Sequence, residues 1–204
     1  MGRTSDSRQR LMDAAHELIW GYSYGAVTIE AICDRAKVKK GSFYYFFDSK
    51  SDLALAAINA WWEERRALVE EMFGPEVPPL ERLMKYLDFV AQRQLQTYEE
   101  EGQMLGCPLF TLGSEICNQD ERILGLVQEI MAAGVRYFEQ AVCDAQARGE
   151  VDGRNPVVKA RLLWAFYEGT LTRARIENNP ELMRNLCTDA LELIGARMPA
   201  AMVA

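Results

Sequence analysis

Apolar residues recur at helical spacing from the start of the chain. The first set falls at i, i+3, i+4, i+7 and i+8: Leu11, Ala14, Ala15, Leu18 and Ile19. This spacing predicts a helix over residues 5–20 with one buried face. A short second helix is expected after Thr28, whose hydroxyl suits an N-cap, and a short third helix from Lys39 or Lys40 through Phe47. A longer fourth helix is expected over residues 50–73.

Prolines divide the rest of the chain. Segment 74–79 holds three prolines in six residues, which interrupts the helical pattern. Beyond it, helical patterns recur over residues 80–100, 108–117, 120–148, 156–178 and 180–197. Pro108, Pro156 and Pro180 stand at first helical positions, where a proline sacrifices no helical hydrogen bond. No strand pattern competes, so the sequence predicts an all-α fold of about nine helices.

Charge is distributed unevenly along the 204 residues. The whole chain carries a formal net charge of -7, yet residues 1–50 hold eight Lys or Arg against six Asp or Glu. Between Arg35 and Lys50 there are five basic residues and one acid, Asp48. A locally basic head of this kind suits a phosphate backbone, although a solvated polar turn has the same composition.

Residues 28–50 have the arrangement of a helix-turn-helix, which lays its second helix in the major groove of DNA. The candidate DNA-binding residues are Thr28, Lys39, Lys40, Gly41, Ser42, Tyr44, Tyr45 and Lys50. The lysines and the N-terminus at Thr28 are expected to hold phosphates, and the small residues and tyrosines to approach phosphates or base edges. Phe43 and Phe47, four residues apart, are expected on the buried side of the reading helix.

The string VTIEAICDRAKVKKGSFYYFFDSKSDL resembles the signature of the tetracycline-repressor (TetR) family of bacterial regulators. The resemblance covers residues 8–55 and implies a repressor that binds double-stranded operator DNA. It places six residues at common operator-contact positions: Thr28, Lys40, Ser42, Tyr44, Tyr45 and Lys50. One position departs from the pattern, since Lys37 stands where the family usually has glycine; a side chain there would be strained in a left-handed turn.

The same resemblance implies two domains. Residues 1–50 are expected to form the DNA-binding domain, and residues 51–204 the ligand-binding and dimerisation domain, with 51–73 as a connecting helix. The last two helices are expected to pair two copies into a homodimer, which suits a palindromic operator, although their apolar spacing fits an internal core equally well. A small-molecule effector in the second domain is expected to release the DNA.

Candidate effector-binding residues lie in this second domain. Cys107 precedes Pro108, so its thiol is expected at the N-terminus of the sixth helix, where the helix dipole favours a reactive thiolate; a simple packing role is the alternative. Its Gly-Cys segment resembles a family branch responsive to electrophiles. Large aromatic side chains complete the candidate set: Phe89, Phe110, Phe138, Trp164 and Tyr167. Together they favour an electrophilic or aromatic effector.

Other functions are disfavoured by the residues present. The single histidine, His16, has no catalytic partner in the pattern, so we expect no enzyme, no metal site and no cofactor. Five cysteines without CxxC spacing and the absence of a long apolar run indicate a cytoplasmic protein outside the membrane. The alternative function is that of a helical small-molecule-binding protein that does not bind DNA.

Overall fold

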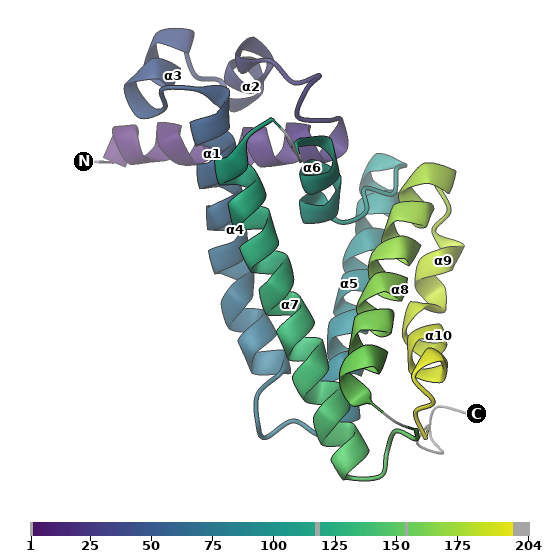
Figure 1. Cartoon of the computed structure of the whole chain (residues 1–204). Coiled ribbons are helices and arrows are strands. Elements are labelled where there is room, and N and C mark those ends of the chain that lie inside the picture. Colours follow the sequence, from purple (N-terminus) through teal and green to yellow (C-terminus); the bar gives the residue numbers. More distant parts are fainter. Residues whose placement is uncertain (1, 117–118, 154, 198–204) are drawn as a thin grey trace. The chain divides into compact units, whose positions relative to one another are not determined.

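The computed structural model describes residues 2–116, 119–153 and 155–197 (Figure 1). Every regular element in these ranges is a helix, apart from an isolated antiparallel bridge between Val151 and Ala196. The predicted all-α fold is therefore confirmed. Among the helices described, none has the length and apolarity needed to cross a membrane.

The helices follow one another along the chain with short connections. They are α1 (Gly2–Gly21), α2 (Ile29–Ala36), α3 (Lys40–Phe46), α4 (Lys50–Met72), α5 (Pro79–Glu101), α6 (Pro108–Ile116), α7 (Glu121–Ala147), α8 (Pro156–Glu177), α9 (Glu181–Arg184) and α10 (Leu186–Leu193). The sequence predicted one helix over residues 180–197, and this was wrong. Asn185 leaves the helical region (φ -104°, ψ 1°), which separates α9 from α10 and gives ten helices in the described chain.

The chain forms two compact units, and each unit takes its residues from two separate stretches. The first unit contains residues up to Ala67 together with Pro108–Ile130. Within it α1 packs against α2, α3 and α6. Its fully buried side chains come from all of these segments, as Leu11, Ile32, Phe43, Leu53, Ile116 and Ile123 show. Burial of apolar surface on several short helices at once fixes their mutual positions.

The second unit contains Leu68–Cys107 and the chain from residue 131 onward. In it α10 lies against both α5 and α8 (Figure 1). The core between these helices and the rest of α7 includes Leu83, Leu87, Phe138, Leu163 and Leu171, each at most 1% exposed. Such a core is large enough to hold charged groups away from water.

Arg82 is one such charged group. It is 5% exposed, and its Nη1 donates to Oδ2 of Asp144 at 2.8 Å. Its Nε donates to the carbonyl of Val77 at 2.8 Å, and its Nη2 donates to that of Pro75 at 3.3 Å. Arg82 therefore ties the proline-containing connection before α5 to α7, and its buried charge is satisfied on all sides.

Replacement of this guanidinium tests how much the tie contributes. We expect Arg82→Met to lower the free energy of unfolding by about 3 kcal/mol, because Asp144 and two carbonyls lose a charged donor while the aliphatic stem is kept. Urea unfolding at fixed protein concentration measures this. Lys85→Met is the control, since Lys85 forms an exposed pair with Glu81 on the same helix and should cost under about 0.5 kcal/mol. Equal losses in the two variants would contradict the assignment.

Candidate nucleic-acid interface

The N-terminus of α2 is capped by Thr28, as the sequence predicted. The Thr28 backbone is extended (φ -97°, ψ 160°), and its Oγ1 accepts a hydrogen bond from the N–H of Ala31 at 3.1 Å. Glu30, in the first turn, complements the positive end of the helix. Thr28 is exposed, so this helix end lies open to an approaching phosphate.

The turn after α2 passes through Lys37 in the left-handed conformation (φ 53°, ψ 44°). The N–H of Lys37 donates to the carbonyl of Asp34 at 3.2 Å, and the N–H of Val38 donates to that of Cys33 at 2.9 Å. The strain expected for a side chain at this position is therefore present, at about 1 kcal/mol. The turn keeps its geometry because Val38 and Cys33 are buried on either side of it.

Helix α3 has a buried side and an exposed side. Phe43 and Phe47 are 0% and 5% exposed, which confirms their predicted place in the core. Tyr44 and Tyr45 are 53% and 74% exposed. Gly41 is exposed as well, and no atom lies within 4 Å of the position that a side chain there would occupy. The exposed side of α3 thus combines two phenol groups with an open stretch of backbone.

Lysines surround the start of α3. Lys39 and Lys40 are exposed, and together with Lys37, Glu30 and neighbouring residues they line an open hollow of about 390 Å³. The Lys40 ammonium forms an ion pair with the Glu30 carboxylate, and the hydrogen bond from Lys40 holds the pKa of that carboxyl below its usual value. Because both partners are exposed, this pair is weak and exchangeable. Lys39 makes no ion pair within the described chain.

Lys50 has a different position from the other candidate lysines. Its Nζ donates to the carbonyls of Tyr24 at 2.8 Å and Val27 at 2.9 Å, and it lies 4.2 Å from the centre of the Tyr24 ring. Burial lowers the pKa of this ammonium. Lys50 therefore fastens the loop before α2 to the start of α4.

Glu115 holds the same loop from another direction. Its carboxylate, on α6, accepts hydrogen bonds from the N–H groups of Tyr24 at 2.9 Å and Gly25 at 2.6 Å. A side chain at residue 25 would meet Glu115 Oε1 at 2.9 Å, so the carboxylate would have to shift to make room for it. Glu115 could not be predicted from the sequence, because about ninety positions separate it from the loop and no local pattern marks it.

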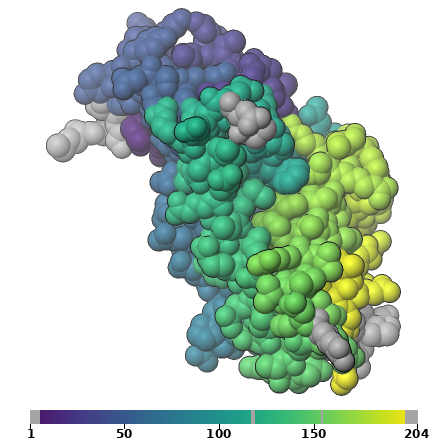
Figure 2. Space-filling view, viewed as in Figure 1, coloured from purple at the N-terminus to yellow at the C-terminus, as the bar shows by residue number. Residues whose placement is uncertain are grey.

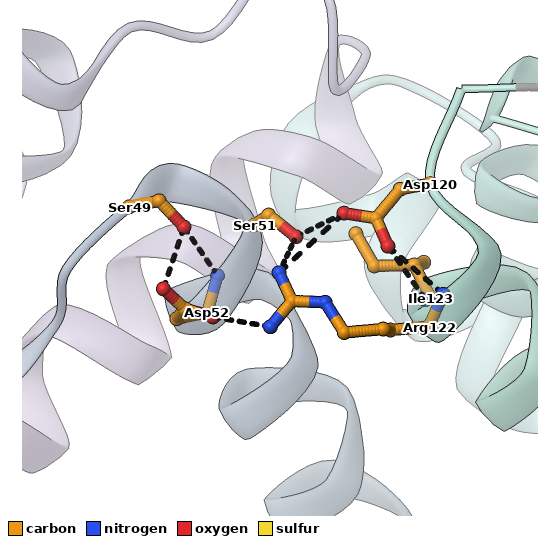
Figure 3. A network of polar contacts seen from close by, with 6 residues as sticks. All are labelled: Ser49, Ser51, Asp52, Asp120, Arg122 and Ile123. Carbon is orange, nitrogen blue, oxygen red and sulfur yellow. Dashed lines mark hydrogen bonds and ion pairs between the residues drawn. The ribbon is translucent and has the colours of Figure 1, made fainter.

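A third set of contacts joins the starts of α4 and α7 (Figure 3). Arg122 donates to Asp52 Oδ1 at 2.8 Å and to Ser51 Oγ at 3.0 Å, and Ser51 also bonds the Asp120 carboxylate. Hydrogen bonds from Ser49 and Arg122 lower the pKa of Asp52, and one from Ser51 lowers that of Asp120. Within the first unit, α6 is thus bonded to the loop before α2, and the start of α7 is bonded to the start of α4.

Three of the six candidate effector-binding residues lie together in one aromatic cluster. Phe138, Trp164 and Tyr167 come together in the second unit, with ring centroids 5.1 to 6.0 Å apart. Cys107 packs on the edge of the same core, whereas Phe89 lies outside that core cluster. Phe110 belongs to α6 in the first unit and is 37% exposed.

Comparison with known proteins agrees with this architecture. A family model described as bacterial regulatory proteins of the tetR family matches residues 11–57. A second, described as the tetracyclin repressor-like C-terminal domain, matches residues 79–189. The transcriptional regulator AcuR of Cereibacter sphaeroides is 28% identical over 177 residues, covering 86% of this chain and 79% of AcuR. The repressor DhaR of Mycobacterium sp. is 23% identical, covering 92% of this chain and 91% of DhaR.

Solved structures show the same fold. A regulatory protein TetR from Rhodobacter sphaeroides aligns with a TM-score of 0.79 and 26% identity, over 92% of this chain and 98% of that one. A TetR-family regulator from Agrobacterium tumefaciens aligns with a TM-score of 0.84 and 20% identity, over 95% of this chain and all of that one. Both halves of the chain match the same group of DNA-binding transcriptional regulators, and the chain therefore belongs to the TetR family.

Proposed function

We propose that this protein is a cytoplasmic homodimeric repressor that binds a palindromic operator and leaves it when a small molecule binds the second unit. The exposed side of α3 carries this proposal. Tyr44, Tyr45 and Gly41 face solvent there, on the side of the helix opposite the buried Phe43, and are open to a DNA groove. Relatives named as transcriptional repressors support it. The protein acts by binding and not by catalysis.

In this proposal each α3 enters a major groove. Gly41 allows close approach of the DNA, Ser42 and the tyrosines reach bases or phosphates, and Lys39 neutralises a phosphate without first breaking an ion pair. Lys40 exchanges Glu30 for a phosphate. Lys50 has a structural role in this proposal, because its ammonium already donates hydrogen bonds to two carbonyls of the loop before α2.

The outer face of α8 supports a dimer. Val158, Leu162 and Ile176 are 48%, 56% and 79% exposed, and they recur at helical spacing along one side. Ala165 and Gly169, also exposed, lie between them and leave room for a close helix crossing. Helix α8 lies at the surface, in light green to yellow-green, in Figure 2. With Leu193 of α10, 49% exposed, it fits pairing through the last helices.

The proposed release signal travels through α6. This helix begins immediately after Cys107 and ends at the carboxylate that grips the loop before Thr28. A shift of α6 would therefore move the N-terminus of α2 and, through the short turn at Lys37, the reading helix α3. An aromatic or electrophilic compound bound near Cys107 is the kind of effector that this route accommodates.

Two head variants test DNA binding. Against the protein's own upstream DNA, we expect Lys39→Ala to weaken binding and to reduce the slope of log affinity against log salt by about 1. Gly41→Leu should cost roughly thirtyfold or more in affinity, because a side chain blocks close approach, while leaving the fold intact. Fluorescence anisotropy at two salt concentrations measures both. Lys85→Ala is the control on α5, and unchanged affinity in both head variants would refute the proposal.

The dimer is tested by placing a charge on the α8 face. Leu162→Glu should convert the protein from dimer to monomer in sedimentation velocity, because a carboxylate at the centre of an apolar interface stays unpaired. Operator affinity should fall with it. Gln92→Glu adds the same single negative charge to an exposed site on α5 and should leave the dimer unchanged. A dimeric Leu162→Glu protein would rule out this interface.

The grip of α6 on the loop predicts a local effect. In Glu115→Ala the amides of Tyr24 and Gly25 lose their charged acceptor, so their hydrogen exchange should accelerate roughly ten- to a hundredfold. Amide exchange followed by NMR or mass spectrometry measures this. Glu121→Ala, an exposed residue at the start of α7, is the matched control. Unchanged exchange at the two amides would exclude Glu115 as a link between α6 and the head.

A further inference from the structure

The turn that leads to Cys107 is held in a fixed shape inside the second unit. Gln94, on α5, accepts from the N–H of Gly106 at 3.0 Å and donates to its carbonyl at 2.9 Å. Arg175, on α8, donates to the carbonyl of Leu105 at 2.7 Å. Gly106 is left-handed (φ 69°), which allows the backbone to approach α8 closely. These bonds set the Cys107 thiol against α8.

The group that meets this thiol is the carboxyl of Glu168. Glu168 is 4% exposed, and its only side-chain hydrogen bond within the described chain is with Cys107. Its Oε2 is fully buried and has no partner among the described residues. Burial raises the pKa of this carboxyl to about 7. In either protonation state one buried polar atom of Glu168 is unsatisfied, which native cores rarely tolerate.

The surroundings of Glu168 are aromatic. Tyr86 of α5 and Tyr167 of α8 bring their hydroxyls within 3.3 Å of each other, and their rings stand 5.8 Å apart. Trp164, one helical turn before Glu168, lies 5.4 Å from the Tyr167 ring. Tyr86, Trp164 and Cys107 are only half-buried, so the cluster reaches the surface. The faces of such rings attract cations.

The Glu168 carboxyl has no positively charged partner among the described residues. In the described chain no lysine or arginine pairs with it, whereas the other buried charge of this unit, Arg82, is fully paired. Buried carboxylates in proteins are normally matched by a cation or a metal. The described residues contain no cluster of metal-ligating side chains, so the missing partner fits an organic ligand.

We propose that Glu168 anchors the positively charged nitrogen of an organic cation, an amine or amidine on an aromatic body, and that this cation is the effector. The inference rests on the repressor function proposed above and names the chemistry of its ligand. The N–H groups satisfy Oε2, the charge is shared with the tyrosine and tryptophan rings, and the apolar body packs on the same rings.

A pH dependence follows from this arrangement. Binding requires the ionised carboxylate, so affinity should rise as pH passes upward through about 7 and should be about tenfold higher at pH 8 than at pH 6. The other titratable groups around Glu168 are Tyr86 from α5, Tyr167 from α8 and Cys107 from the turn. Burial raises the pKa values of both tyrosines, so they stay neutral over this range.

Three probes with one body and different head groups test the ligand class: 1-naphthylmethylamine, 1-naphthalenemethanol and 1-naphthoate. Calorimetry on the full chain at pH 8 should show the amine binding at least tenfold more tightly than the alcohol, with no binding of the carboxylate. The wild-type titration at pH 6 and pH 8 needs no variant. Absence of amine binding, or equal affinity for amine and alcohol, would overturn the proposal.

Variants then locate the site. Glu168→Gln keeps the shape and removes the charge, so both the preference for the amine and its pH dependence should disappear. Glu177→Gln, on the exposed end of the same helix, should retain both. Cys107→Ser should also retain amine binding, whereas its loss there would point to a thiol-centred site instead. Thermal unfolding checks that each variant is folded.

Operator binding measured without any probe separates this inference from the proposed function. Failure to bind operator DNA would refute the repressor, whatever the calorimetry shows. Operator binding without a preference for the amine would refute only the role of Glu168. If both hold, addition of the amine should release the wild-type protein from DNA and leave the Glu168→Gln protein bound.

Discussion

The loop before α2 is the point on which the DNA-binding surface depends. It is an irregular segment whose N–H and C=O groups need hydrogen-bond partners. Two side chains of opposite charge provide these partners. Lys50 takes two carbonyls, and Glu115 takes two N–H groups. The loop ends at Thr28, so whatever holds it also sets the direction of α2. Helix α3 follows after the short strained turn at Lys37, so the direction of α2 also fixes where α3 begins.

This arrangement separates the surface that meets DNA from the elements that support it. Tyr44 and Tyr45 on the exposed side of α3 face solvent, and the Lys40 ammonium is held only by an exposed pair with Glu30, while Phe43 and Phe47 anchor the helix in the core. Support comes from α4, α6 and the start of α7, all within the first compact unit. The chain enters α6 from the second unit and leaves the first unit again within α7. The two units are therefore joined covalently at helices that support the DNA-binding surface.

Among the described residues of the second unit, the two buried charged side chains, Arg82 and Glu168, differ in whether their polar atoms have partners. Arg82 has a carboxylate and two carbonyls around it, and it closes the connection before α5. Glu168 has a thiol and a set of aromatic rings, and one of its oxygens has no donor in the described chain. The first is a structural tie. The second has the character of a binding site, because a buried acceptor without a donor lowers stability unless something else supplies one.

The sequence by itself determined the all-α class, the position of the helix-turn-helix, the cap at Thr28 and the buried side of α3. Each depends on residues a few positions apart, and helical spacing makes such residues neighbours. The sequence did not predict the break at Asn185, because the apolar spacing continues across it. Glu115, the inward role of Lys50 and the pairing of Cys107 with Glu168 were decided only by the tertiary structure. Their partners are 23 to 91 positions away or on another helix, and packing brings them together where no local pattern records it.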